Sequence, residues 1–375
     1  MSTAASAVDA FDGLAARLRR RPDIEAHDLV AADASDRLIL AEAGELRGTV
    51  AVIGDRYGAL TLSLLASDPD LRVRVHQDAL TGERALALNA AELGLPLDRV
   101  SWHDLDAALL EDADTALLQL PRSLDALDEI AGLVSGAGGR LVAGGRIKHM
   151  SLGMNDVLSR HFARVDVSRA ASKSRVLQGS EPRAGTAGVW PRCERHVDLG
   201  LIVCAHGAAF AGTSIDIGTR FLLSFLPDLP AAAVGIDLAC GTGVLATMLA
   251  KAQPGIRVIA SDQSAAAVSS ARATAEANGV ADRVAVVRDD GLGAQPDASA
   301  DLILLNPPFH SGAAVTEEIA PRMFADAARV LRPGGELWVV FNSHLGYRPI
   351  LERAVGKTHQ AGRNAKFTVT VSTRR

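Results

Sequence analysis

A polar and aromatic segment follows an apolar run late in the chain. Residues 302–305 are apolar and predict a buried strand, and Asn306-Pro307-Pro308-Phe309 comes directly after them. The side-chain oxygen of Asn306 can accept a hydrogen bond from an exocyclic amine, and the carbonyl of Pro307 offers a second acceptor, because proline fixes φ and carries no N–H. Phe309 can stack on the base that bears the amine. These four residues are therefore predicted to be catalytic and to align an aromatic amine, although a Pro-Pro turn alone would also suit a rigid loop.

A glycine-containing turn in "GIDLACGTGVLA" is a second candidate site. A strand leads to Asp237, a turn with Ala239, Cys240, Gly241 and Gly243 follows, and an amphipathic helix comes next. Glycines let a ligand approach the backbone closely, and the first N–H groups of a helix are free to bind it. We predict that these five residues bind a cofactor, although a tight turn that needs positive φ would also use glycine. Cys240 is typical of a small packed residue rather than a nucleophile.

Acidic residues end the next two predicted strands. Asp262, followed by Gln263, ends "IRVIASD" about 20 residues after the glycines, where an acid can accept both hydroxyls of a ribose. An N-cap of the next helix is the alternative for Asp262. Asp289 and Asp290 end "RVAVVRDD" and could meet the exocyclic amine of an adenine, or lie in a solvated turn. We predict that all four residues belong to the cofactor site.

A nicotinamide dinucleotide is the obvious rival ligand for this turn. A nicotinamide dinucleotide favours the pattern G-x-G-x-x-G, and here the third place holds Ala246, which matches only loosely. Asp237 would have no role beside a dinucleotide, but it suits the amino group of S-adenosylmethionine. Ligands bind at the carboxyl ends of parallel strands, so Asn306 is expected to face the reactive end of this cofactor.

The two halves of the chain repeat one pattern, which predicts a duplicated α/β domain. "VAVIGDRYGALTLSLLA" (50–66) parallels "GIDLACGTGVLATMLAK" (235–251), with Gly58 matching Gly243, and "TALLQLPRS" parallels "LILLNPPFH". Later landmarks keep the same order, as expected for a repeat. We predict two domains, 1–185 and 196–375, joined through residues 178–196, which are rich in Gly, Pro and polar residues.

The first copy has lost the residues that carry the chemistry. Val52, Asp55, Arg56 and Tyr57 stand where the second copy has Asp237, Cys240, Gly241 and Thr242, and Tyr57 in place of a glycine would crowd a ligand. Gln119-Leu120-Pro121-Arg122 replaces Asn306-Pro307-Pro308-Phe309. The apolar framework survives, so this domain is predicted to be a degenerate scaffold or RNA-binding domain.

Taken together, "DLACGTG", "ASDQS" and "NPPFH" resemble the class I S-adenosylmethionine-dependent methyltransferases that modify exocyclic amines. The duplicated layout resembles the tandem-domain ribosomal RNA guanine-N2 methyltransferases, with the 16S small-subunit type as the best match. The lead-in with Asp216, Gly218, Thr219 and Arg220, and the ending with Asn364, Lys366 and Phe367, are also similar to that family. Ala239 departs from it, because the family usually has glycine there.

The resemblance implies two Rossmann-like domains with mostly parallel, seven-stranded sheets. It also implies methyl transfer from S-adenosylmethionine to the N2 amine of a guanine in ribosomal RNA, with 16S favoured over 23S. The target base would be unpaired or flipped out of a helix. Two alternatives stay open: a methyltransferase for another amine, of adenine or a protein glutamine, and a catalytically inactive RNA-binding ribosome assembly factor.

The composition limits the partners and the location. The formal net charge of −5 gives no global signal for nucleic acid, but basic residues gather in two segments. We predict that an RNA substrate contacts some of them, together with His310, which is otherwise a loop residue: Arg160, Arg164, Lys173, Arg175, Arg363 and Lys366.

Three cysteines are too few and too scattered for a disulfide framework or a zinc site, so no metal is predicted and a reducing cytoplasm is the simplest location. The start has no signal-peptide core and no apolar run is long enough to span a membrane. The protein is expected to be a cytoplasmic monomer that works on ribosomal RNA or a ribosomal subunit.

Overall fold

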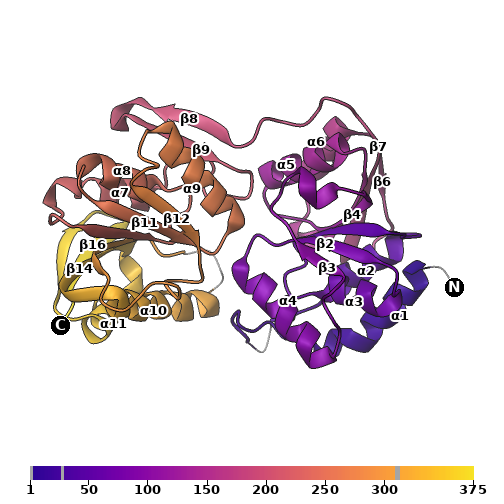
Figure 1. Cartoon of the computed structure of the whole chain (residues 1–375), viewed down its shortest axis with the longest axis horizontal. Helices are drawn as coiled ribbons and strands as arrows, with labels where there is room; N and C mark the ends of the chain where they lie inside the picture. The colour runs from indigo at the N-terminus through magenta and orange to yellow at the C-terminus, as the bar shows by residue number, and fades with distance from the viewer. Residues whose placement is uncertain (1–2, 27–28, 309–312) are drawn as a thin grey trace. The chain divides into compact units, whose positions relative to one another are not determined.

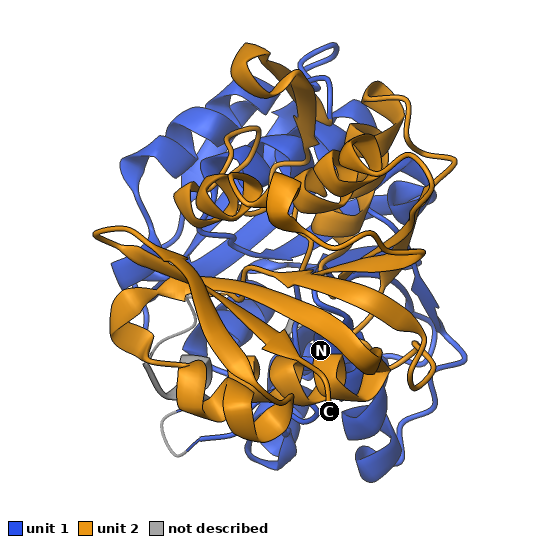
Figure 2. Cartoon of the chain, turned by 90° about the vertical axis from the view of Figure 1, so that its left-hand side faces the viewer, with its two compact units in different colours: residues 1–190 blue, residues 191–375 orange. Residues whose placement is uncertain are grey.

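The chain forms two compact units, residues 1–190 and 191–375, in a computed structural model that describes residues 3–26, 29–308 and 313–375 (Figures 1 and 2). The division falls inside the stretch 178–196 where the sequence places a linker. Both ends of that stretch are regular structure, however. Residues 178–182 belong to strand β7 (Ser174–Pro182), and β8 (Arg192–His196) begins directly after the division.

The first unit is a seven-stranded sheet between two layers of helices. The strand order is β3-β2-β1-β4-β5-β7-β6, and the pairs that involve β7 are antiparallel while the others are parallel. Helices α1 to α4 pack on one face of the sheet, and α5 and α6 on the other. The other strands are β1 (Thr49–Ile53), β2 (Arg72–His76), β3 (Val100–Trp102), β4 (Ala113–Gln119), β5 (Arg140–Arg146) and β6 (Phe162–Val167). The helices are α1 (Thr3–Leu14), α2 (Ala34–Glu42), α3 (Ala59–Ser67), α4 (Leu80–Leu93), α5 (Leu124–Gly136) and α6 (Leu152–His161).

The second unit repeats this topology strand for strand, in the order β12-β11-β10-β13-β14-β16-β15. The strands are β10 (Val234–Leu238), β11 (Arg257–Asp262), β12 (Val284–Arg288), β13 (Ala300–Leu305), β14 (Leu331–Asn342), β15 (Thr358–Arg363) and β16 (Phe367–Thr373). The helices are α7 (Ile217–Leu223), α8 (Val244–Ala252), α9 (Ala265–Ala277), α10 (Ala313–Val330) and α11 (Arg348–Ala354). Short 3₁₀ turns are η1 (Ala15–Arg17), η2 (Ala107–Leu110), η3 (Ile147–His149), η4 (Val197–Leu199), η5 (Leu226–Asp228) and η6 (Ser343–Leu345). The predicted α/β fold, with two tandem Rossmann-like domains and seven-stranded sheets, is confirmed.

The glycine turns of the two units correspond as the repeat predicts. Gly58 and Gly243 both have left-handed backbone, with φ of 93° and 74°, and each is followed directly by a helix. Arg56, with φ of 40°, takes the place of Gly241 as the aligned sequences indicate, so Tyr57 matches Thr242 and does not replace a glycine. Tyr57 is buried, and its hydroxyl donates to Asp23 at 2.5 Å. The first copy therefore keeps the shape of the turn while it fills the surroundings with its own side chains.

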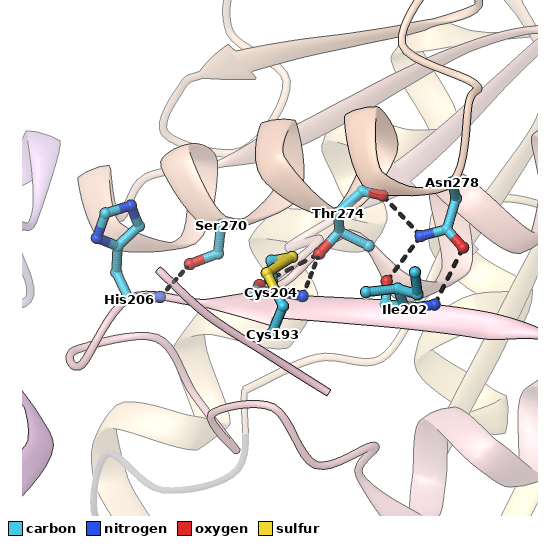
Figure 3. The surroundings of a disulfide bond; sticks show 7 residues. All are labelled: Cys193, Ile202, Cys204, His206, Ser270, Thr274 and Asn278. Atoms are coloured by element: carbon cyan, nitrogen blue, oxygen red, sulfur yellow. Dashed lines mark hydrogen bonds between the residues drawn. A yellow bond between two sulfur atoms is a disulfide. The ribbon is translucent and has the colours of Figure 1, made fainter. Parts of the chain in front are cut away.

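A hairpin precedes the second sheet and corrects the reading of the cysteines. Its strands, β8 and β9 (Leu201–Ala205), pair Cys193 with Cys204 across the hairpin, and the two residues form a disulfide (Figure 3). They are 11 positions apart in sequence, and the hairpin brings their Cα atoms to 4.0 Å. The cysteines looked too scattered because strand pairing, rather than sequence spacing, decides which residues face each other.

The other edge of β9 lies along helix α9, and side chains of the helix satisfy its backbone (Figure 3). Ser270, Thr274 and Asn278 are spaced by four residues, so they share one face of the helix or continue it just past its end. The side chains of Thr274 and Asn278 each bond both the N–H and the carbonyl of one β9 residue, Cys204 and Ile202 respectively. Ser270 accepts from the N–H of His206 at 2.9 Å. A helix face thus takes the place of a neighbouring strand.

Replacement of Thr274 tests this contact. We expect Thr274→Val to lower the free energy of unfolding by about 2 kcal/mol, because the buried backbone groups of Cys204 on that edge lose their partner. The measurement is denaturant unfolding.

Thr247→Val is the matched control, because Thr247 is also a fully buried helical threonine, and its hydroxyl has no hydrogen-bond partner among the described residues. It should be neutral or slightly stabilising. Equal effects of the two changes would show that the hydroxyl of Thr274 does not hold the hairpin.

In the part of the chain that the structure describes, no helix has the length and apolar character needed to cross a membrane.

Candidate active site

Strand β13 carries Asn306 to the carboxyl edge of the second sheet, where its amide is held on one side only. All four residues of the predicted buried run, 302–305, are fully buried. The side-chain nitrogen of Asn306 donates to Asp216 Oδ2 at 3.0 Å and to Thr219 Oγ1 at 2.9 Å. The side-chain oxygen is buried and has no hydrogen-bond partner among the described residues. Asn306 therefore presents an unused acceptor at the edge where ligands bind.

Asp216 has a second role at the start of helix α7. It is the N-cap residue, and its Oδ2 atom accepts from the N–H groups of Gly218 at 2.8 Å and Thr219 at 3.1 Å. Gly218 leaves the room that this arrangement needs, since a Cβ there would lie 2.9 Å from Asp216 Oδ2 and 3.4 Å from Asn306 Oδ1. The first turn of α7 and the end of β13 thus form one hydrogen-bonded unit.

The rest of the predicted catalytic segment is only partly described. Pro307 is buried and Pro308 is exposed. Phe309 and His310 lie outside the described residues, so their predicted roles as a stacking ring and a substrate contact stay predictions.

Asp237, at the end of β10, is a buried carboxylate with one oxygen in use. Its Oδ2 accepts from the N–H of Ala246 at 2.8 Å, and its Oδ1 has no partner among the described residues. Burial raises the pKa of Asp237 to about 7, the N–H of Ala246 opposes this, and the charge of Asp262 adds to it. A cationic ligand at Oδ1 would favour the ionised form, so this residue fits the amino group of S-adenosylmethionine.

The turn after Asp237 keeps a glycine-like backbone. Ala239 has φ of 57° and Gly241 has φ of 53°. The left-handed conformation of Ala239 costs about 1 kcal/mol, which explains why glycine is the usual residue there. The Cys240 thiol is buried, and burial followed by the charges of Asp262 and Asp237 raises its pKa. This supports a packed residue over a nucleophile.

Asp262 connects the turn to the next strand. Its carboxylate accepts from the N–H of Gly241 at 3.0 Å and from the N–H of Ser264 at 2.9 Å. The N-cap of α9 is Ser264, so the alternative of Asp262 as the N-cap is wrong. Gln263 is exposed beside it. Contact of Asp262 and Gln263 with a ribose stays a prediction.

Asp289 and Asp290 follow β12 and differ in their surroundings. Asp289 is buried and accepts from the N–H of Ala294 at 2.7 Å, so it stabilises its own loop. Asp290 is half-buried and lies 3.8 Å from the guanidinium of Arg322. The burial of Asp289 argues against the solvated turn that was the alternative for it, and contact of either residue with an adenine stays a prediction.

The first unit makes corresponding hydrogen bonds with different residues. Gln77 accepts from the N–H of Arg56 at 3.1 Å, as Asp262 does from Gly241. Asp55 accepts from the N–H of Thr61 at 2.7 Å, which matches the bond from Ala246 to Asp237. Burial raises the pKa of Asp55 to about 6. The supports of the turn therefore persist in a copy that lacks its chemistry.

The basic residues predicted to meet RNA fall into two groups. Arg160 and Arg164 form ion pairs, with Asp128 at 3.1 Å and with Asp166 at 2.6 Å. Lys173, Arg363 and Lys366 are exposed, and Arg175 is half-buried; their contact with RNA stays a prediction. Arg374, near the end of the chain, is instead structural. Its guanidinium donates to the backbone carbonyls of Arg329 and Leu331, where α10 meets β14.

Two residues of the site were reached only through resemblance. Asp216 and Thr219 hold the Asn306 amide, yet they precede it by about 90 positions. The available signal was local: an aspartate such as Asp216 before an apolar run is typical of a helix N-cap. That pattern predicts where a helix begins, but not which strand it contacts.

Comparison with known proteins agrees with this geometry. The family model of the methyltransferase small domain matches residues 200–371, and that of the RLMG N-terminal domain matches residues 9–183. The ribosomal RNA large subunit methyltransferase G of Streptomyces coelicolor is 37% identical over 366 residues, which cover 94% of this chain and 96% of the relative. The chain belongs to this family. The protein of the same name from Pseudomonas aeruginosa PAO1 is 35% identical, with 94% and 96% covered. The predicted membership of the S-adenosylmethionine-dependent ribosomal RNA methyltransferases is confirmed.

A solved structure shares the fold. The T. thermophilus 16S rRNA N2 G1207 methyltransferase (RsmC), in complex with AdoMet and guanosine, is 23% identical and has a TM-score of 0.72 over 92% of each chain. The fold of this chain is thus also found in a solved structure.

The raised pKa of Asp237 predicts how cofactor affinity depends on pH. A cationic amino group binds the ionised carboxylate, so below about pH 7 binding must first remove a proton. Calorimetric titration with S-adenosylmethionine should show affinity falling as the pH is lowered through 7, by at most about tenfold per pH unit.

Asp237→Asn should bind more weakly and lose this pH dependence. Asp301→Asn is the control, because Asp301 bonds Ala233 and Val234 at the opposite end of β10 and should leave the dependence unchanged. A pH-independent affinity in the unmodified protein would refute the role of Asp237.

Proposed function

We propose that this protein transfers a methyl group from S-adenosylmethionine to the N2 amine of a guanine in ribosomal RNA of the large subunit. The observation that carries the proposal is the Asn306 amide, whose nitrogen is held by Asp216 and Thr219 while its oxygen is a buried acceptor without a partner among the described residues. A site built in this way suits a ligand that donates an N–H, as an exocyclic amine does.

In the second unit, some residues bind the cofactor and others bind the target guanine. S-adenosylmethionine supplies an electrophilic methyl group on a sulfonium. Asp237 holds the amino group of this cofactor, and Asp262 its ribose. Asn306 and the carbonyl of Pro307 accept the two hydrogens of the target amine and so aim its lone pair. No strong general base is needed, because a proton can leave after the methyl group has been transferred.

The choice of guanine and of the large subunit rests on the relatives. The proteins that are 35–37% identical over 94% of this chain are named for the large subunit, whereas the 16S enzyme shares 23% identity. The greater similarity favours large-subunit RNA, which reverses the preference for 16S that the sequence motifs suggested. The N2 position is the one named for the 16S enzyme of the same fold. In a paired guanine this amine lies in the minor groove, so the target is expected to be unpaired or flipped out.

Asn306→Ala tests the proposal. Transfer of labelled methyl to large-subunit RNA from a strain that lacks the enzyme should fall by about 10²–10³-fold, as for loss of a positioned hydrogen-bonding group at a reacting centre. Gln119→Ala, the matching amide change in the first unit, is the control and should retain transfer.

Mass spectrometry of the nucleosides identifies the product. N2-methylguanosine supports the proposal, whereas methyladenosine or methylated protein would mean that the amine was assigned wrongly. If the unmodified protein transfers no methyl group, whether or not it binds S-adenosylmethionine, the result would favour an inactive assembly factor.

A further inference from the structure

The contacts of Asn306 settle which way its amide can point. An asparagine amide has two hydrogens to donate and one oxygen to accept, and a half-turn about its last bond exchanges them. Here Asp216 Oδ2 and Thr219 Oγ1 take both hydrogens, at 3.0 and 2.9 Å. In the reversed amide, the oxygen of Asn306 would face the carboxylate of Asp216, which cannot donate. The reversed form loses the bond to Asp216 and places two acceptors together, whereas the Thr219 hydroxyl would donate to the amide oxygen instead of accepting.

Asp216 is itself prevented from turning away. Its Oδ2 atom also accepts the N–H groups of Gly218 and Thr219 at the start of α7. Moving this oxygen would remove the N-cap, and an N-cap stabilises a helix by about 1 kcal/mol. Gly218 keeps the space between the three groups open, since a Cβ there would meet Asp216 Oδ2, Phe367 and Asn306 Oδ1.

We propose that Asp216 and Thr219 are positioning residues that hold the Asn306 amide with its oxygen toward the target amine. This proposal rests on the function proposed above. In this proposal, the residues at the start of α7 orient the Asn306 amide so that the site favours a ligand that donates an N–H. A reversed amide would present a donor, which suits a carbonyl or a ring nitrogen instead.

The first unit shows that a tie of this kind also serves folding. Gln119, at the end of β4, donates to Asp36 in the first turn of α2, and Asp36 stands at the helix position that corresponds to Thr219. A contact between strand end and helix start is thus present in the copy that lost Asn-Pro-Pro-Phe. The test must therefore separate orientation of the amide from stability of the unit.

Variants that keep the helix cap make this separation. Thr219→Val removes an acceptor with little change of shape, and Asp216→Ser keeps a good N-cap while its shorter hydroxyl withdraws from Asn306. Each should lower kcat for methyl transfer about tenfold, the loss expected for one hydrogen bond at the reacting group, with little change in KM for S-adenosylmethionine or in Tm. Thr219→Ser and Asp216→Asn keep an acceptor oxygen in place and should restore kcat to within about twofold.

A readout without substrate follows the amide directly. In protein labelled with ¹⁵N-asparagine, the side-chain hydrogens of Asn306, assigned by their absence in Asn306→Ala, should exchange slowly with water. They should exchange faster in Asp216→Ser and Thr219→Val.

Unchanged kcat in Asp216→Ser and Thr219→Val would overturn the inference. A fall in kcat that goes with an equal loss of Tm and cofactor affinity would also overturn it, since the contact would then be structural only. If the unmodified protein methylates no guanine but its Asn306 hydrogens are protected as described, the proposed function fails while the positioning role stands. If the protein methylates guanine but its Asn306 side-chain hydrogens exchange rapidly with water, the proposed function stands while the positioning role fails.

Discussion

Several helices begin beside the carboxyl edge of each sheet, and their first N–H groups need hydrogen-bond acceptors. The rest of the structure depends on which side chains provide these acceptors. The first N–H groups of a helix have no partner within it. Asp237 bonds one in α8, Asp216 bonds two in α7, and Ser264 bonds one in α9. Crossover connections bring these helix starts to the edge where the parallel strands end. Two of these groups, Asp237 and Asp216, therefore complete a helix and also belong to the candidate site.

This requirement explains why a degenerate copy can keep its fold. In the first unit, Asp55 bonds the start of α3, and Gln77 bonds the N–H of Arg56. These bonds match those of Asp262 and Asp237. Gln77 differs from Asp262 in residue type, whereas Asp55 is an aspartate like Asp237 but stands at another position of the turn. The first unit therefore keeps the hydrogen bonds that support the turn, although it lacks the residues predicted to carry the chemistry.

Much of this could be predicted from the sequence, because it depends on patterns that are local. Buried apolar runs such as residues 302–305 predict parallel strands, and the repeated landmarks Gly58 and Gly243 predict the duplication. The candidate site was less accessible. Asp216 and Thr219 are near no other site residue in sequence, and Asp55 looked like the counterpart of Cys240 because alignment compares positions along the chain rather than positions of carboxylates. The pairing of Cys193 with Cys204 was missed for the same reason, since it depends on the register of a hairpin.

By itself, the sequence determined the class of fold, the repeat and the type of cofactor, and it predicted which residue would meet the target amine. Each of these follows from residue types at short spacing: glycines in a turn, acids at strand ends, and an amide before two prolines. Only the tertiary structure decided which side of that amide is free, because this depends on Asp216 and Thr219 of another element. A hydrogen bond is a contact between positions in space, and folding brings these positions to within 3 Å although about 90 residues separate them.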